Sequence, residues 1–244
     1  GIMPPWKPSA DCNHYQNERR IDAAAIQLFA DWAAAGAPAG DPADAPPPID
    51  TDTGLPRVDR TIAMADDYTP KVEPSDPDDL HCFLLAPELP PDARMLGFYV
   101  HPGEPRVVHH VLLYLPDASE ADALDAADPG LGYSCFGGPL ATSAAVVAGW
   151  VPGMPAITYP EGTGIPLAEG SKLIMQIHYN TLQAGPLPDR TAVDLMLTDA
   201  TEGTQAQIMS VRDTGCAIPP NPKDHSTTVT IDAPRDGNVS APAP

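Results

Sequence analysis

Apolar and polar residues alternate along most of the chain after about residue 61. A period of two is typical of half-buried β-strands, and clusters of Pro, Gly and Asp separate these segments. The expected strands are 79–86, 96–101, 106–115, 172–180, 191–198, 206–212 and 226–231. Short strands without long helices between them favour two packed sheets. We therefore expect a mainly β fold, an antiparallel jelly-roll-like β-sandwich with a short N-terminal helical segment.

The first 49 residues follow a different period. Apolar residues recur there at spacings of three and four, which predicts a helix between Glu18 and Ala35. Asp22 is the expected N-cap and Gly36 the expected stop, and Gly40 to Pro48 is typical of a linker. Within the β region, the acidic stretch 117–128 is expected to be a surface loop or a single helical turn. The Gly- and Pro-rich stretch 150–171 is expected to be a long ordered connection.

Composition restricts the partners. The 33 Asp and Glu residues against 13 Lys and Arg give a formal charge of -20, which would repel nucleic acids and anionic membranes. The 32 prolines disfavour long helices, and the sequence has no apolar run long enough to span a bilayer. The chain does not open with a signal peptide, so we expect that one has been removed or that the sequence starts inside a longer protein.

The four cysteines, Cys12, Cys82, Cys135 and Cys216, are widely spaced. The absence of a Cys-x-x-Cys pair argues against a zinc ribbon, a thioredoxin-like site or a covalently attached haem in this chain. An even count in an acidic, proline-rich chain favours disulfides and an extracytoplasmic location, periplasmic or secreted. Free buried thiols are the alternative.

Three of the seven histidines lie inside apolar segments that are expected to be strands. His109 and His110 are adjacent, and His178 lies in a second strand. Adjacent side chains on a strand point to opposite faces, so both can reach one ion only if the strand twists locally or contains a bulge. Three neutral imidazoles suit copper or zinc, and the alternative is hydrogen-bonded histidines in the core.

The remaining polar candidates are expected to have ordinary roles. His81 is interpreted as a surface partner of Cys82 and His101 as a strand-end residue, while His14 and His225 lie in polar loops. Four carboxylates are interpreted as solvated loop charges: Asp66, Asp67, Asp78 and Asp79.

Several segments together resemble a known family. His109-His110-Val-Leu-Leu-Tyr and Gln176-Ile-His178-Tyr-Asn resemble the first copper site of the type II, ascorbate-dependent copper monooxygenases, which include peptidylglycine α-hydroxylating monooxygenase and dopamine β-monooxygenase. Between and after them stand further similar segments, in order from about Asp78 to Asp232: Ala148-Gly-Trp-Val-Pro-Gly, Pro160-Glu-Gly-Thr-Gly and Met209-Ser-Val-Arg-Asp-Thr-Gly-Cys-Ala-Ile-Pro-Pro.

The resemblance implies that His109, His110 and His178 ligate one copper ion that transfers electrons. It also implies a disulfide between Cys82 and Cys135, which leaves Cys12 and Cys216 as a second pair. The family's second domain would carry the other copper, on a His-x-His pair and a methionine, together with most contacts to a small-molecule or peptide substrate. No His-x-His occurs here, and Met175 and Met209 are expected to be core residues.

The resemblance also implies a domain organisation. Residues 50–235 would form the copper-binding sandwich, and 236–244 would be a link toward an absent second domain, so that this chain alone would be inactive. Residues 1–49 resemble the end of a c-type-cytochrome-like domain, in which Met3 would be an axial haem ligand if a haem-binding segment lay upstream. Two other functions stay open: a non-catalytic copper-binding or electron-transfer module, and a structural or assembly sandwich.

Overall fold

The computed structural model describes residues 21–47, 54–199, 203–211, 215, 217, 220 and 227–232. The chain divides into two units. One unit is Asp50–Ser210, and the other combines Gly1–Ile49 with Val211–Pro244.

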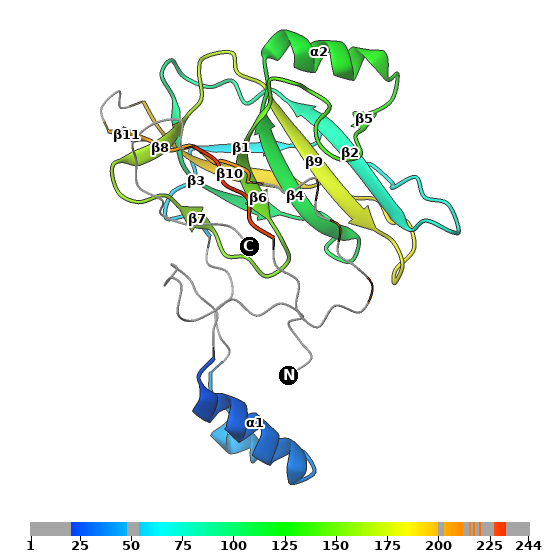
Figure 1. Cartoon of the computed structure of the whole chain (residues 1–244), viewed down its shortest axis with the longest axis vertical. Helices are drawn as coiled ribbons and strands as arrows, with labels where there is room; N and C mark the ends of the chain where they lie inside the picture. Colours follow the sequence, from blue (N-terminus) through cyan, green and yellow to red (C-terminus); the bar gives the residue numbers. More distant parts are fainter. Residues whose placement is uncertain are drawn as a thin grey trace. The chain divides into compact units, whose positions relative to one another are not determined.

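Two sheets build the larger unit (Figure 1). One has the order β1-β10-β3-β8-β11, with β7 also beside β3, and the other has the order β5-β2-β9-β4-β6. Neighbouring strands run antiparallel except β11, which is parallel to β8. The expected mainly β sandwich with a short N-terminal helix is confirmed. The strands are β1 (Arg60–Ala63), β2 (Asp78–Leu85), β3 (Arg94–His101), β4 (Val108–Leu115), β5 (Tyr133–Ser134), β6 (Ala145–Trp150), β7 (Ile157–Thr158), β8 (Thr163–Pro166), β9 (Leu173–Asn180), β10 (Ala192–Thr198) and β11 (Thr204–Gln205).

The main core lies between the two sheets. On β9, alternate residues Leu173, Met175, Ile177 and Tyr179 are fully buried and belong to this core. The alternation follows from the pleat, which sends every second side chain to the same face. Burying each large apolar side chain stabilises the fold by roughly 1.5–3 kcal/mol before the entropy cost of ordering it.

The outer face of the five-stranded sheet is covered at one end by helix α2 (Ala118–Ala127). Ala121 of this helix is fully buried in a second, smaller core with Tyr114 and Ile174. The Asp117 side chain caps the helix by accepting from the Ser119 N–H. The expected loop or single turn over 117–128 is therefore wrong, because a capped, alanine-rich segment forms nearly three turns once its apolar side can pack on the sheet.

The described part of the smaller unit contains helix α1 (Ala23–Ala34) and a 3₁₀ turn, η1 (Pro42–Asp44). As predicted, Asp22 is the N-cap: its carboxylate accepts from the Ala25 N–H at 2.7 Å. Gly36, at φ +86°, follows the helix in a conformation that glycine adopts most easily. No helix in the described segments is both long enough and apolar enough to cross a membrane.

Two expected strands near the end of the chain are wrong in the residues that the structure describes. Residues 206–211 and 227–231 carry no strand, and only the short β11 precedes them. Ile208, Met209 and Val211 are at least 38 % exposed, so their alternation has no sheet face to pack on. The expected connection over 150–171 contains two short strands, β7 and β8.

Candidate metal centre

His109, His110 and His178 come together at the end of the outer face that α2 leaves open. His110 on β4 stands directly opposite His178 on β9, so both side chains lie on the same face. The register between β4 and β9 shifts between Val108 and His110, which makes His109 the extra residue of a bulge. Of the two expected possibilities, a local twist or a bulge, the structure has the bulge, which explains how both rings reach one place.

The three rings approach one another through the same nitrogen atom. The Nδ1 atom of His110 lies 3.3 Å from Nδ1 of His109 and 3.3 Å from Nδ1 of His178. One ligand nitrogen from each ring can be chosen so that all lie within 4.8 Å of one another. Two nitrogens about 2.0–2.1 Å from a metal at the tetrahedral angle are about 3.3–3.4 Å apart. The spacing therefore fits a shared ion.

The protonation state of His110 also favours metal binding. Burial, followed by the neighbouring His178 and His109 rings, lowers the pKa of His110 from 6.5 to about 4. His110 is therefore neutral at physiological pH, and a neutral imidazole is the form that binds metals. The Nε2 atom of His178 lies 2.9 Å from Oδ1 of Asp78. Since a carboxylate can only accept, Nε2 carries a proton, and in the metal-binding form of the ring Nδ1 presents the lone pair.

Asp78 lies next to the histidines because of strand register, which corrects its interpretation as a solvated loop charge. It begins β2 directly opposite Asn180 on β9, two residues from His178 on the same face. Its Oδ1 accepts from the Asn180 side chain at 2.7 Å and from His178. These two hydrogen bonds, that from Asn180 first, lower the pKa of Asp78, so the group is an anion at neutral pH.

The centre lies on the outer face of the five-stranded sheet, away from the core between the sheets. On β9, His178 alternates with the buried core residues Ile177 and Tyr179 and points the other way. His109 is exposed, and His110 and His178 are partly buried. Solvent and small molecules can therefore reach the site directly.

A second polar cluster occupies the inner face of the same strands. The Tyr68 hydroxyl donates to Asp79 at 2.7 Å and lies 3.0 Å from Nδ1 of His81. Nε2 of His81 lies 2.8 Å from the Leu131 carbonyl. Both His81 and Asp79 are buried, which corrects their interpretations as a surface residue and a solvated charge. Burial lowers the pKa of His81 and, with Asp79, raises that of Tyr68.

Asp189 extends this inner cluster. Its carboxylate accepts from the Tyr179 hydroxyl at 2.9 Å, from the Thr191 hydroxyl at 2.8 Å and from the Glu104 N–H at 2.8 Å. Asp189 is 1 % exposed. Among the described residues, every buried side-chain nitrogen and oxygen has a hydrogen-bond partner. The inner cluster is thus complete without any ligand.

The other predicted site residues divide into three groups. Cys82 and Cys135 form a disulfide in the smaller core, where Gln176 donates to the Cys135 carbonyl at 2.7 Å. His101 ends β3, as expected, and pairs with Asp194 at 2.7 Å. Met175 is a core residue, as expected, but the same expectation for Met209 is wrong, because no strand forms there and its side chain is exposed. Outside the described residues lie Met3, Cys12, His14, Cys216 and His225.

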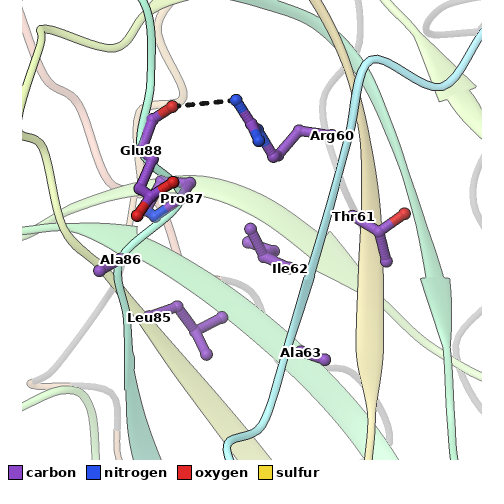
Figure 2. A pocket seen from close by; sticks show the side chains of 8 residues that line it. All are labelled: Arg60, Thr61, Ile62, Ala63, Leu85, Ala86, Pro87 and Glu88. Atoms are coloured by element: carbon purple, nitrogen blue, oxygen red, sulfur yellow. Dashed lines mark hydrogen bonds between the residues drawn. The ribbon is translucent and has the colours of Figure 1, made fainter.

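One surface pocket lies elsewhere on the larger unit, between β1 and the segment that follows β2 (Figure 2). It has a volume of about 230 Å³ and is lined by Arg60–Ala63 and Leu85–Glu88. The Arg60 guanidinium donates to the Glu88 carbonyl at 3.1 Å. None of the three clustered histidines lines this pocket, so it is separate from the candidate metal centre.

No protein-family model matches the chain, and a search of curated proteins finds no match either. The residues of the site and their geometry therefore have to support any functional conclusion.

Proposed function

We propose that this chain is the copper-binding, electron-transferring half of a copper-dependent monooxygenase that hydroxylates C–H bonds in its complete form. The observation that supports the proposal is the convergence of three Nδ1 atoms from two strands, 3.3 Å apart around His110. The order of the segments that resemble the family's first copper site is a second, independent support.

Copper suits this ligand set better than zinc. Nitrogen sites generally bind Cu²⁺ more tightly than other divalent first-row metals. When bound, copper would supply one-electron chemistry between Cu(I) and Cu(II). His109, His110 and His178 would hold it, and the exposed side of His109 leaves the site open to a reductant. We also propose an extracytoplasmic location, which the Cys82–Cys135 disulfide supports.

The first experiment is a copper titration of the purified chain. We expect about one Cu(II) per chain, with nitrogen hyperfine splitting in the electron paramagnetic resonance spectrum. The double variant His109→Ala/His110→Ala should lose this binding. His101→Ala is the matched control, because His101 is an exposed histidine on the other sheet and should leave binding unchanged. Preferential retention of zinc over copper, or equal binding by the double variant, would overturn the copper proposal.

The enzymatic half of the proposal has its own test. A longer form of the protein should contain a His-x-His segment and a later methionine that bind a second copper. That form should hydroxylate C–H bonds of a small-molecule or peptide substrate and lose the activity in the double variant. A full-length protein that binds only one copper would instead be a non-catalytic copper protein.

A further inference from the structure

Among the described residues, Asp78 is the acidic side chain that hydrogen-bonds to one of the three clustered histidines, His178. We infer that Asp78 is a positioning residue that fixes His178 for coordination through Nδ1 and makes the centre prefer Cu(II) over Cu(I). This inference rests on the proposed copper function and adds a control over the redox state of the bound ion.

Strand register places the carboxylate with little freedom. Asp78 is the direct cross-strand partner of Asn180 and the diagonal neighbour of His178. One oxygen, Oδ1, accepts from both of these side chains, at 2.7 Å and 2.9 Å. The backbone N–H of Asp78 in turn donates to Asp76 at 3.2 Å. The carboxylate is therefore held by two hydrogen bonds from β9, and its short side chain loses little freedom in forming them.

The hydrogen bond selects which nitrogen of His178 faces the other rings. With the proton on Nε2, the lone pair is on Nδ1, and Nδ1 is the atom that lies 3.3 Å from His110. A tautomer with the proton on Nδ1 would instead direct a positive N–H dipole toward the ion. Holding the imidazole in the binding tautomer increases metal affinity, and loss of such an outer partner weakens binding about 10–100-fold.

The hydrogen bond between Asp78 and His178 should also affect Cu(I) and Cu(II) binding differently. A carboxylate that accepts from the ligand N–H makes the imidazole a stronger electron donor, and this stabilises the more highly charged ion more. Bound Cu(II) would carry one more positive charge than Cu(I), and Asp78 would offset that charge through His178. The Asp78 side chain is 40 % exposed, so direct attraction through solvent is screened and the hydrogen bond is the main route.

The test compares Cu(II) and Cu(I) affinities of the full chain, measured by competition with chelators specific for each state. Asp78→Asn should weaken Cu(II) binding about 10–100-fold and Cu(I) binding less, so that the ratio of the two affinities falls and the midpoint potential rises. Asp78→Glu, which keeps the charge, should restore part of the ratio. Asn180→Ala, which frees the carboxylate, should give a smaller fall.

Asp194→Asn is the matched control. It removes a carboxylate from the other histidine–aspartate pair described here, that of His101 at 2.7 Å on the other sheet, and should leave both affinities unchanged. An unchanged ratio in a folded Asp78→Asn variant would overturn the inference alone. If that variant does not fold, an unchanged ratio in Asn180→Ala and in Asp78→Glu would overturn it equally. Failure of the wild-type chain to bind copper would instead overturn the proposed function, and the inference with it.

Discussion

The two faces of strands β2 and β9 carry similar polar side chains, but the histidines on the two faces differ in their hydrogen-bond partners. On the inner face, both ring nitrogens of His81 lie within hydrogen-bond distance of protein groups, the Tyr68 hydroxyl and the Leu131 carbonyl. On the outer face, Nε2 of His178 contacts Asp78, whereas its Nδ1 lies 3.3 Å from Nδ1 of another clustered histidine, His110. Histidine nitrogens that meet only one another indicate a ligand site. Histidines whose ring nitrogens both meet other protein groups indicate a structural role.

The comparison predicts that the inner cluster determines stability and the outer cluster determines metal binding. Asp189→Ala should have the largest effect, lowering the free energy of unfolding by about 3–5 kcal/mol, because several buried donors lose one charged acceptor. Urea denaturation measures this loss. Copper stoichiometry should not change, and Asp66→Ala, at an exposed carboxylate, should leave stability unchanged. A loss below about 1 kcal/mol for Asp189→Ala would contradict a structural role for this network.

His110→Ala should abolish copper binding and change the stability of the copper-free chain little. For the wild-type chain, copper at 100 times its dissociation constant should stabilise the fold by about 2.7 kcal/mol. The variant should lose this stabilisation, since His110 lies between the other two ligands. Its copper-free stability should change by less than about 1 kcal/mol, because the ring is only half buried. Thermal unfolding with and without copper measures both quantities.

His81→Ala is the matching variant on the inner face. It removes a buried ring that stacks on Tyr68 at 4.2 Å and the ring's hydrogen bonds, so stability should fall by about 2 kcal/mol. The stabilisation by copper should stay as in the wild-type chain. If the His81 variant lost copper binding while remaining folded, the two faces would not be independent.

Acid should produce a smaller effect in the copper-free protein. The pKa of His110 falls from 6.5 to about 4 on folding, and that of His81 also falls. The unfolded chain therefore binds more protons below about pH 6.5, and the free energy of unfolding should decrease from there toward pH 4. His110→Ala should make this decrease shallower, which denaturation at several pH values would show. A rise in stability over this range would contradict the sign.

The features that neighbouring residues determine could be predicted from the sequence. The adjacent His109 and His110 predict a local twist or a bulge, because regular strand alternation sends them to opposite faces, and the structure has a bulge. The expected strand 172–180 differs from β9 by one residue. Helix α2 also has a local signal, since Asp117 and Glu120 have the spacing of a capping box. The acidic composition of that stretch instead predicts a surface loop or a single helical turn.

Roles that depend on register could not be read from the sequence. Asp78 and Asp79 are neighbours with the same side chain, yet one contacts His178 of the candidate metal centre and the other accepts from the buried Tyr68. Only the pairing of β2 with β9 decides which of them points outward. The alternating residues near 208–211 show the converse, because a pattern without a neighbouring strand does not make a sheet.

Because His109 is the extra residue of a bulge, β4 can keep its place in the sheet without it. Val108 and Val111 both lie in the core, three residues apart, because one extra residue sits between them. Deleting His109 would return β4 to ordinary pleating while leaving both valines inward and His110 outward. Such a deletion variant would keep the fold of the sheet and present only His110 and His178 on its outer face.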